Sequence, residues 1–295
     1  MKPAHFDYHR ALSVGDAVSL LQTYGEEAKI IAGGQSLIPM MNFRLARPTH
    51  LVDIGRLQEL NRITVHQDTV VIGALTPHAS VENHPDLGGD SCWRLLRKAI
   101  GYIGHAPIRN RGTVGGSIAH ADGLAEWPAL SILLEGVITV SGPSGQRSIP
   151  AADFFLGLYT TTLDPEEVVT ELTLRKPTPF HSFEEVATRH GDFATTAVGV
   201  VLTPGDGTVS GARVVVAGAA PAPQRLGSVE EYLRERPLDA PFAADAATGL
   251  AAALSTDLGE PEPGDGYVRD ILPHVIITAV TSAAAGDREE VRHEH

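Results

Sequence analysis

The hydrophobic and polar positions of the first fifty residues predict a helix between short strands. Residues 14–24 carry apolar side chains at helical spacing, with Ser13 placed to cap the start and Gly25 the end. The apolar run 28–32 predicts a buried strand that ends at two glycines, and residues 50–54 predict another strand. The N-terminal part is therefore expected to combine helix and strand.

Alternation of apolar and polar residues predicts two β-hairpins farther along the chain. They cover residues 63–76 and 137–149, each with turn residues near its middle. Helical spacing predicts helices over residues 92–104 and 126–136, the second with Pro128 in its first turn. Hairpins and helices thus follow one another up to about residue 150.

A change of composition near residue 177 divides the chain. Pro177 and Pro179 fall within the segment 174–181, and prolines so close together indicate a domain boundary. Beyond it the pattern predicts three strands and then three helices. The strands are 183–189, 195–203 and 210–220, and the helices are 228–237, 243–258 and 267–286, before a polar tail at 287–295.

The composition is that of a soluble globular protein with an acidic surface. The chain has 295 residues, and 23 Lys and Arg against 36 Asp and Glu give a formal net charge of −13. That length suggests two domains. No basic stripe is visible, so we expect no nucleic-acid partner. An acidic surface suits a soluble enzyme or a subunit that meets protein partners.

Cysteine, histidine and apolar runs restrict the cofactors and the location. Cys92 is the single cysteine, so the chain cannot form an intrachain disulfide or hold an iron–sulfur cluster by itself. The 13 histidines are mostly isolated, and we expect no metal site. No run reaches the roughly 18 apolar residues of a membrane span, and the N-terminus lacks a signal-peptide core. We therefore expect a cytoplasmic protein.

Two diglycine segments are the candidate site for a phosphate group. Each places two glycines beside small hydroxyl residues, and glycine lets the main chain approach a ligand closely. Successive N–H groups in such turns form anion-binding nests. The segments are Ala32, Gly33, Gly34, Gln35 and Ser36, and Thr113, Val114, Gly115, Gly116 and Ser117. One diglycine alone is more often only a tight turn, whereas two in one half of the chain favour a ligand.

The common nucleotide and hydrolase motifs are absent. Neither diglycine segment has the glycine spacing of a Rossmann fingerprint or the Gly-Lys-Ser/Thr of a Walker A loop. No Gly-x-Ser-x-Gly nucleophile elbow occurs either. We therefore expect any nucleotide to be held by a different fold, and we expect no catalytic residue in this chain.

The sequences around the two diglycines resemble those of a known protein family. AGGQSLIPMMNFRLARPTHLVDI (32–54) and IRNRGTVGGSIAHAD (108–122) resemble the two flavin-binding signatures of the medium, FAD-binding subunits of molybdenum hydroxylases. That family includes carbon monoxide dehydrogenase medium subunits and the FAD domain of xanthine dehydrogenase. The resemblance covers nearly the whole chain.

The resemblance implies an α+β fold with two domains. Residues 1–176 would form an FAD-binding domain of the vanillyl-alcohol-oxidase or PCMH type, with subdomains at about 1–55 and 56–176. Residues 177–286 would form a smaller αβ domain of the CO-dehydrogenase-flavoprotein type, a three-stranded antiparallel sheet with helices. The tail 287–295 lies outside both.

The resemblance also implies roles for individual residues. The diglycine segments would cradle the FAD pyrophosphate and the adjoining ribityl chain. Asp122 and Glu126 are candidates for an acidic residue near the ribityl hydroxyls, and Leu163 falls where a main-chain contact to the flavin edge is expected. Phe193 falls where relatives often carry a tyrosine over one flavin face. Stacking is kept by phenylalanine, but a hydroxyl hydrogen bond is not.

The implied function is that of the FAD-binding subunit of a heteromeric molybdenum hydroxylase. Partners would be a small iron–sulfur subunit and a large molybdopterin subunit, arranged as a dimer of heterotrimers. Electrons would pass from [2Fe–2S] clusters to FAD in this chain and then to an external acceptor: NAD, a quinone, a cytochrome or oxygen. Two alternatives remain, a self-sufficient FAD-dependent oxidoreductase and a non-catalytic interaction protein.

Overall fold

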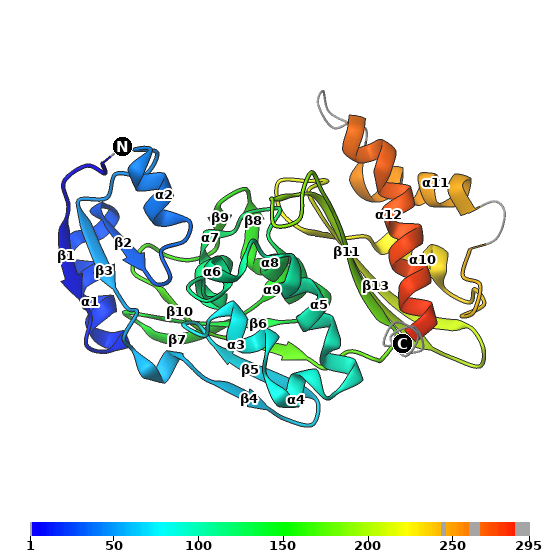
Figure 1. The fold of residues 1–295 in the computed structure, drawn as a ribbon, viewed down its shortest axis with the longest axis horizontal. Helices are drawn as coiled ribbons and strands as arrows, with labels where there is room; N and C mark the ends of the chain where they lie inside the picture. Colours follow the sequence, from blue (N-terminus) through cyan, green and yellow to red (C-terminus); the bar gives the residue numbers. More distant parts are fainter. Residues whose placement is uncertain (1, 243–245, 260–265, 287–295) are drawn as a thin grey trace. The chain divides into compact units, whose positions relative to one another are not determined.

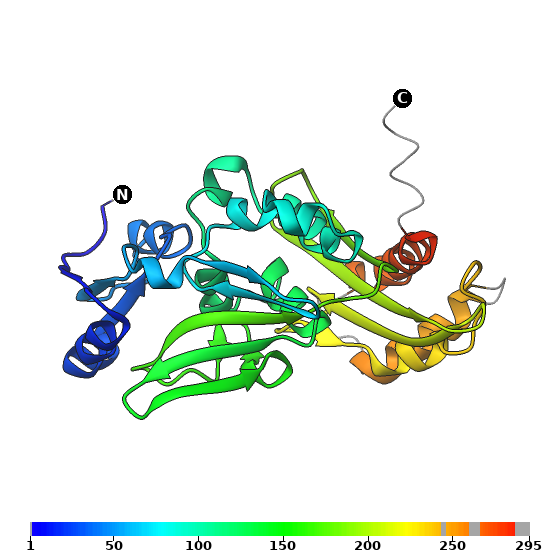
Figure 2. The ribbon, with the colours of Figure 1, turned by 90° about the horizontal axis from the view of Figure 1, so that it is seen from below.

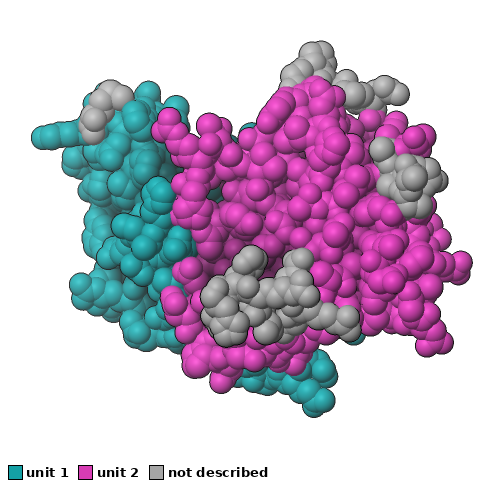
Figure 3. All heavy atoms as spheres, turned by 45° about the vertical axis from the view of Figure 1, so that its right-hand side comes forward, with its two compact units in different colours: residues 1–81, 105–121, 135–175 teal, residues 82–104, 122–134, 176–295 magenta. Residues whose placement is uncertain are grey.

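The computed structural model describes residues 2–242, 246–259 and 266–286. Figures 1 and 2 show its fold from two directions. Contacts divide the chain into two compact units, which Figure 3 colours teal and magenta. Unit 1 comprises residues 1–81, 105–121 and 135–175, and unit 2 comprises residues 82–104, 122–134 and 176–295. The chain therefore passes between the units several times before residue 176.

Unit 1 begins with a small parallel sheet and helix α1. The strand order is β1-β3-β2, and the bounds are β1 Asp7–Arg10, α1 Val14–Tyr24, β2 Ala28–Ile31 and β3 His50–Asp53. Ser13 Oγ accepts a hydrogen bond from the N–H of Asp16 (3.0 Å), and Gly25 ends the helix. The predictions for α1, β2 and β3 are confirmed, whereas β1 is an unpredicted strand.

The second sheet of unit 1 has five antiparallel strands. Its order is β4-β5-β10-β6-β7, with bounds β4 Ile63–Val65, β5 Thr69–Gly73, β6 Val137–Gly142, β7 Gly145–Pro150 and β10 Val168–Arg175. Both predicted hairpins are confirmed, as β4–β5 and β6–β7. The central strand β10 was not predicted, although it joins the two hairpins by pairing with β5 and β6.

Short elements connect these sheets. In the first half of the chain they are η1 Gly25–Glu27, α2 Leu37–Asn42, η2 Gln58–Leu60, α3 His78–Glu82, α6 Ala106–Arg109 and α7 Val114–His120. After residue 150 they are α9 Ala151–Phe154, β8 Phe155–Gly157 and β9 Thr160–Thr161. The first diglycine segment directly precedes α2, and the second forms the start of α7.

Unit 2 is built on a four-stranded antiparallel sheet. Its order is β11-β12-β13-β14, with bounds β11 His181–Ala187, β12 Ala194–Pro204, β13 Val209–Ala217 and β14 Gln224–Arg225. The three predicted strands are confirmed, and the two-residue strand β14 adds a short fourth at the edge. α12 (red) runs along this sheet in Figures 1 and 2.

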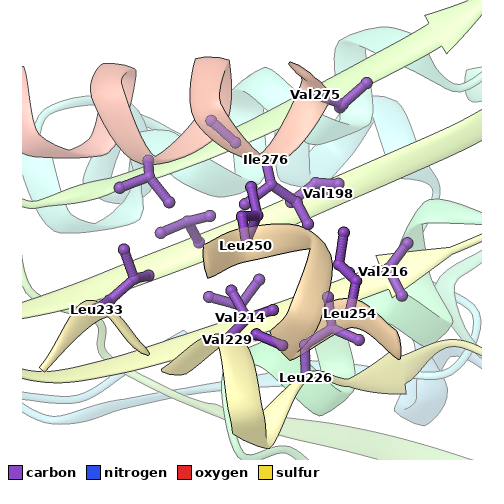
Figure 4. Close-up of a cluster of buried hydrophobic side chains, with 14 of the residues drawn as sticks. Val198, Val214, Val216, Leu226, Val229, Leu233, Leu250, Leu254, Val275 and Ile276 are labelled. Atoms are coloured by element: carbon purple, nitrogen blue, oxygen red, sulfur yellow. The ribbon is translucent and has the colours of Figure 1, made fainter. Parts of the chain in front are cut away.

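Three helices and the sheet enclose the main core of unit 2. They are α10 Gly227–Leu233, α11 Ala246–Leu258 and α12 Gly266–Ala285, and all three were predicted. Figure 4 shows their buried side chains meeting those of the strands, among them Val198, Val214 and Val216. Since strand side chains alternate between faces, Val198 and Val200 face this core while Gly199 faces the other side.

Two helices from the first half of the sequence pack on the opposite face of this sheet. They are α5 Arg94–Tyr102, which packs on β11, and α8 Glu126–Leu133, which packs on β12 and β13. A β-carbon built on Gly199 would lie 2.6 Å from Leu133 Cδ2, so glycine makes room for the helix. Both helices were predicted. Two further elements precede α5 in unit 2, α4 Pro85–Gly88 and η3 Ser91–Trp93.

The predicted domain limits and tail remain predictions. The division at residue 176 agrees with the last passage of the chain from unit 1 to unit 2, but unit 2 also contains residues 82–104 and 122–134. The tail 287–295 lies outside the described residues. Among those described, α12 is the one helix whose length and hydropathy would suit a membrane span. Its buried residues recur every three or four positions, as in a core helix.

Candidate functional site

Within unit 1, the first diglycine segment lies against the residues that immediately precede the second. A β-carbon built on Gly33 would lie 2.0 Å from the carbonyl oxygen of Arg111 and 3.0 Å from the Cα of Gly112. Residues 32–36 follow the carboxyl end of β2, and residues 113–117 form the start of α7. The first loop therefore contacts the main chain that leads directly into the second loop, about eighty residues later in the sequence.

The first loop presents main-chain donors that are not used inside the protein. Among the described residues, none accepts a hydrogen bond from the N–H of Gly33, Gly34, Gln35 or Ser36. Gly34 has φ +72°, a left-handed conformation that glycine adopts without strain. The Gln35 side chain folds back to donate to the carbonyl oxygen of Gly33 (3.1 Å). Four successive free N–H groups are the donors that a phosphate group accepts.

The second loop uses most of its donors internally. The N–H groups of Val114 and Gly115 donate to the carbonyl oxygens of Thr76 and Ala74 (3.0 and 2.8 Å). The N–H of Gly116 donates to Thr113 Oγ1 (3.2 Å), and Thr113 thereby caps α7. This loop therefore provides space and hydroxyl groups for a ligand, but few free main-chain N–H groups.

Close packing against Ala74 and His78 fixes the second loop and the residue before it. A β-carbon on Gly115 would lie 2.4 Å from Ala74 Cβ, and one on Gly112 would lie 2.7 Å from His78 Nε2. The ring of His78 is buried, and burial, followed by the charge of Arg109, lowers its pKa to about 4. His78 is therefore a neutral support beneath the loop at neutral pH. Its side chain was not among the predicted site residues.

Leu163 lies in a third loop of unit 1. Its N–H donates to Thr161 Oγ1 (3.2 Å), so its carbonyl group is the main-chain atom left for another contact. Arg147 fixes this loop, because its guanidinium binds both carboxylate oxygens of Glu167 (2.6 and 2.7 Å) and the carbonyl oxygen of Thr162 (2.8 Å). The pKa of Glu167 is lowered, first by this hydrogen bond to Arg147.

The acidic candidates Asp122 and Glu126 lie in unit 2. Asp122 is buried and accepts a hydrogen bond from the N–H of Leu124 (3.0 Å), which shapes the turn before α8. Glu126 begins α8, and burial raises its pKa to about 8, with the charges of Glu185 and Asp122 adding to the effect. Burial also raises the pKa of Glu185 to about 7. The Glu126 carboxyl group therefore keeps its proton at neutral pH, whereas that of Glu185 is about half protonated there.

Glu185 is a second acidic residue that the motifs did not reveal. It lies on β11, and its Oε2 atom is buried without a hydrogen-bond partner among the described residues. Its neighbour Glu184 pairs instead with Lys98 (2.6 Å). Adjacent residues on a strand face opposite sides, so the sequence shows the two glutamates but not which one is desolvated.

Phe193 lies in the connection between β11 and β12 of unit 2. The residue is 76% exposed, and Gly191, two positions earlier, has φ +84°. An exposed phenylalanine at the tip of a hairpin is available to stack on a planar group.

In the part of the chain that the structure describes, no three His, Cys, Asp or Glu side chains are grouped so as to hold a metal ion.

Known proteins resemble this chain over almost its whole length. A family model described as the FAD binding domain in molybdopterin dehydrogenase matches residues 4–177, and one described as the CO dehydrogenase flavoprotein C-terminal domain matches residues 181–281. The carbon monoxide dehydrogenase medium chain of Hydrogenophaga pseudoflava is 40% identical over 256 residues, 86% of this chain and 87% of that protein.

Two further comparisons agree. The nicotine 6-hydroxylase medium subunit of Paenarthrobacter nicotinovorans is 36% identical over 282 residues, 95% of this chain and 99% of that protein. A solved carbon monoxide dehydrogenase structure from Hydrogenophaga pseudoflava, which lacks the Mo-pyranopterin moiety of the molybdenum cofactor, superposes with a TM-score of 0.89 at 36% sequence identity. That match covers 97% of this chain and 99% of the solved chain.

Proposed function

Because this chain belongs to the FAD-binding subunits of the molybdopterin dehydrogenases, we propose that its two diglycine loops hold the pyrophosphate of FAD. The support is the close approach of Gly33 to Arg111 together with the free N–H groups of residues 33–36. A doubly charged pyrophosphate needs several converging donors and no intervening side chain, and this surface has both. This observation carries the proposal.

Each loop has its own part in binding. Gly33, Gly34, Gln35 and Ser36 donate main-chain hydrogen bonds to phosphate oxygens. The second loop, Thr113, Val114, Gly115, Gly116 and Ser117, keeps bulk away from the cofactor and adds the hydroxyl group of Ser117, while Ala32 joins the first loop to β2. The free donors of the first loop give it the larger share of the binding energy.

The remaining candidates orient the rest of FAD. We assign the ribityl hydroxyls to Asp122 and Glu126, a main-chain contact at the flavin edge to Leu163, and one flavin face to Phe193. A Glu126 carboxyl group that keeps its proton near neutral pH can donate as well as accept a hydrogen bond. Phe193 has no hydroxyl group, so its contribution is stacking alone.

FAD, when bound, supplies the redox chemistry, taking up and releasing electrons singly or in pairs. The protein's part is to bind, orient and shield the cofactor. No side chain of this chain is assigned as a general acid or base. With one cysteine in 295 residues, the chain holds no iron–sulfur cluster of its own.

The electron donor is therefore on another chain. Relatives are named as subunits of larger enzymes, and one is a medium chain of carbon monoxide dehydrogenase. We assign to this chain a small iron–sulfur partner and a large molybdopterin partner, assembled as a dimer of heterotrimers in the cytoplasm. Electrons pass from the [2Fe–2S] clusters through FAD to an external acceptor.

Flavin content tests the proposal directly. The full-length chain, purified and then denatured, should release FAD, identified by chromatography against FMN, in about one-to-one amount. The double variant Gly34→Val with Gly116→Val should lose the flavin absorbance. Gly101→Ala is the matched control, because a β-carbon at Gly101 meets nothing within 4 Å. A double variant with full flavin content would refute the placement of the pyrophosphate.

Metal analysis separates the subunit from a self-sufficient enzyme. Iron and molybdenum that co-purify with the native chain support the heteromeric enzyme. Turnover of an organic substrate by the isolated flavin-loaded chain would instead support a self-sufficient FAD-dependent oxidoreductase.

A further inference from the structure

The turn that follows α2 presents large apolar side chains to solvent. Phe43 is 66% exposed and Leu45 is 76% exposed, and Ile38 on α2 is 38% exposed. We call residues 38–47 the α2 tip. Single exposed apolar residues are common on protein surfaces, but three within eight positions form a cluster. Such a cluster needs a physical reason.

The α2 tip is held in one conformation. The N–H groups of Phe43, Arg44 and Leu45 donate to the carbonyl oxygens of Pro39, Met41 and Met40 (3.0, 2.9 and 2.8 Å). Met41 is buried and anchors the segment. The exposed side chains are therefore fixed on a hydrogen-bonded turn, which lowers the entropy lost when a partner binds.

The backbone of the α2 tip is also strained. Arg44 has φ +60°, a left-handed conformation that is unfavourable for a residue with a β-carbon. Strain of this kind persists where the surrounding structure imposes it, and it is concentrated at functional sites. Here it reverses the chain between Phe43 and Leu45.

The α2 tip is basic on a strongly acidic chain. Arg44 and Arg47 are exposed, and no carboxylate among the described residues forms an ion pair with either. In the same unit Arg62, Arg147 and Arg175 each pair with a glutamate. Between Ser36 and Pro48 the sequence has no Asp or Glu, whereas the whole chain carries −13. Within the described part of the chain, the two side chains donate only to main-chain carbonyl oxygens, those of Lys2 and Arg44. Arginines without a carboxylate partner beside apolar groups fit an acidic protein surface.

The position of the α2 tip bears on the kind of partner it would meet. Helix α2, whose six residues span about 9 Å at 1.5 Å per residue, separates the first diglycine loop from the turn that carries Phe43 and Leu45. Electron transfer slows steeply with distance, and this chain cannot hold a cluster, so a cluster-bearing chain must contact it close to FAD. The apolar and basic α2 tip is a surface beside that site.

We infer that the α2 tip docks the iron–sulfur subunit, which presents an apolar hollow rimmed by carboxylates. This inference rests on the proposed function, because it takes FAD to be bound at the neighbouring loop. Phe43 and Leu45 fill the hollow, and Arg44 and Arg47 pair with the rim. The pairing orients the donor subunit toward the cofactor.

The test uses the tagged full-length chain produced together with its two partner subunits. FAD per tagged chain reports on the cofactor site, and iron per FAD reports on docking. In Phe43→Ser with Leu45→Ser, iron per FAD should fall about tenfold or more, as expected for truncated interface anchors. FAD per chain should not change. Both side chains are exposed, so the core is left intact; the thermal unfolding midpoint checks this.

Two further variants sharpen the test. Arg44→Glu with Arg47→Glu should also lower iron per FAD and remove the weakening of the wild-type complex by salt. Leu12→Ser is the matched control, because Leu12 is 80% exposed in the same unit but lies outside the α2 tip, and it should keep full iron content.

Three results would overturn the inference. The first is unchanged iron per FAD in both double variants. The second is loss of FAD itself from a folded Phe43→Ser, Leu45→Ser chain, which would assign the α2 tip to the cofactor. The third is a dimer of the isolated chain that this variant abolishes while iron content stays intact, which would assign the α2 tip to self-association. Absence of FAD from the wild-type chain would instead refute the proposed function.

Discussion

Gly33 and Arg111 approach so closely that a β-carbon on Gly33 would lie 2.0 Å from the carbonyl oxygen of Arg111. No side chain can be added there unless one of the loops moves. Because both contacting atoms belong to main chain, a rotamer change cannot relieve the clash. Gly33→Ala should therefore separate the two loops and reduce FAD affinity by about tenfold or more, equal to at least about 1.4 kcal/mol. Fluorescence titration of the apoprotein with FAD measures this change.

Gly15→Ala is the control for this prediction. A β-carbon on Gly15, inside α1 of the same unit, lies 3.9 Å from Ser13 Oγ, an ordinary contact. The variant should bind FAD as the wild-type chain does and unfold at a slightly higher temperature, since alanine favours helix. Wild-type FAD affinity in Gly33→Ala would show that the loops do not form a joint cradle.

His78 should make the protein sensitive to acid. The unfolded chain takes up a proton at His78 near pH 6.5, whereas the folded chain does so only near pH 4. The unfolded state therefore binds more protons throughout that range, and stability falls as the pH drops from about 6.5 to about 4. The full effect is about 3 kcal/mol.

Denaturant unfolding at several pH values measures it. The free energy of unfolding of the wild-type chain, minus that of His78→Phe, should decrease across the range from pH 6.5 to pH 4. Other groups titrate in both proteins and cancel in this difference. A difference that is flat with pH would contradict a buried neutral histidine beneath the second loop.

Glu126 should have the opposite pH dependence. Its pKa is raised from 4.5 to about 8, mainly by burial, so the folded chain keeps a proton that the unfolded chain has lost. Stability is therefore lost as the pH rises from about 4.5 to about 8. Glu126→Gln removes this effect and should raise the free energy of unfolding at pH 8 by at least about 1 kcal/mol.

The comparison at pH 4.5 and pH 8 is decisive. Glu126→Gln should match the wild-type chain at the lower pH and exceed it at the higher one. Glu26→Gln, at an exposed position on η1, should change stability at neither pH. If Glu126→Gln is destabilising at pH 8, the carboxylate is ionised and paired, contrary to our interpretation.

Arg147 should stabilise the loop that carries Leu163. The side chain of Glu167 is only 7% exposed, so Arg147→Met leaves a carboxylate with little solvent and no cation. We expect a loss of about 1–2 kcal/mol in urea unfolding, a value kept small because Arg147 itself is 43% exposed. Adding Glu167→Gln should recover part of the loss, since the charge is then removed. A double variant less stable than the single one would show that packing, not the ion pair, holds the loop.

Local signals in the sequence were sufficient for most elements of the fold. Ser13 and Gly25 mark the ends of α1 by capping chemistry, which acts within one helical turn. The hairpins β4–β5 and β6–β7 follow from alternation between neighbouring segments. β10 also alternates, yet its partners β5 and β6 are distant in sequence. Its place at the centre of the sheet depends on those long-range pairings.

The candidate site was accessible to sequence reasoning only in part. The diglycine motifs identified both loops, and the resemblance to a flavin-binding family supplied the cofactor. His78 and Glu185 were missed, because what distinguishes them is burial, which depends on residues far along the chain. The internal use of the N–H groups of Val114 and Gly115 was missed for the same reason, since their acceptors are on the segment 74–76.

The packing of α8 on β12 and β13 has a consequence for biosynthesis. During translation this helix leaves the ribosome well before the strands that cover its apolar face have been made. Leu130 and Leu133 are fully buried in the folded protein. Until those strands have been made, both side chains stay in contact with water or with a chaperone. The first half of the polypeptide therefore cannot finish packing its apolar side chains until the second half has been synthesised.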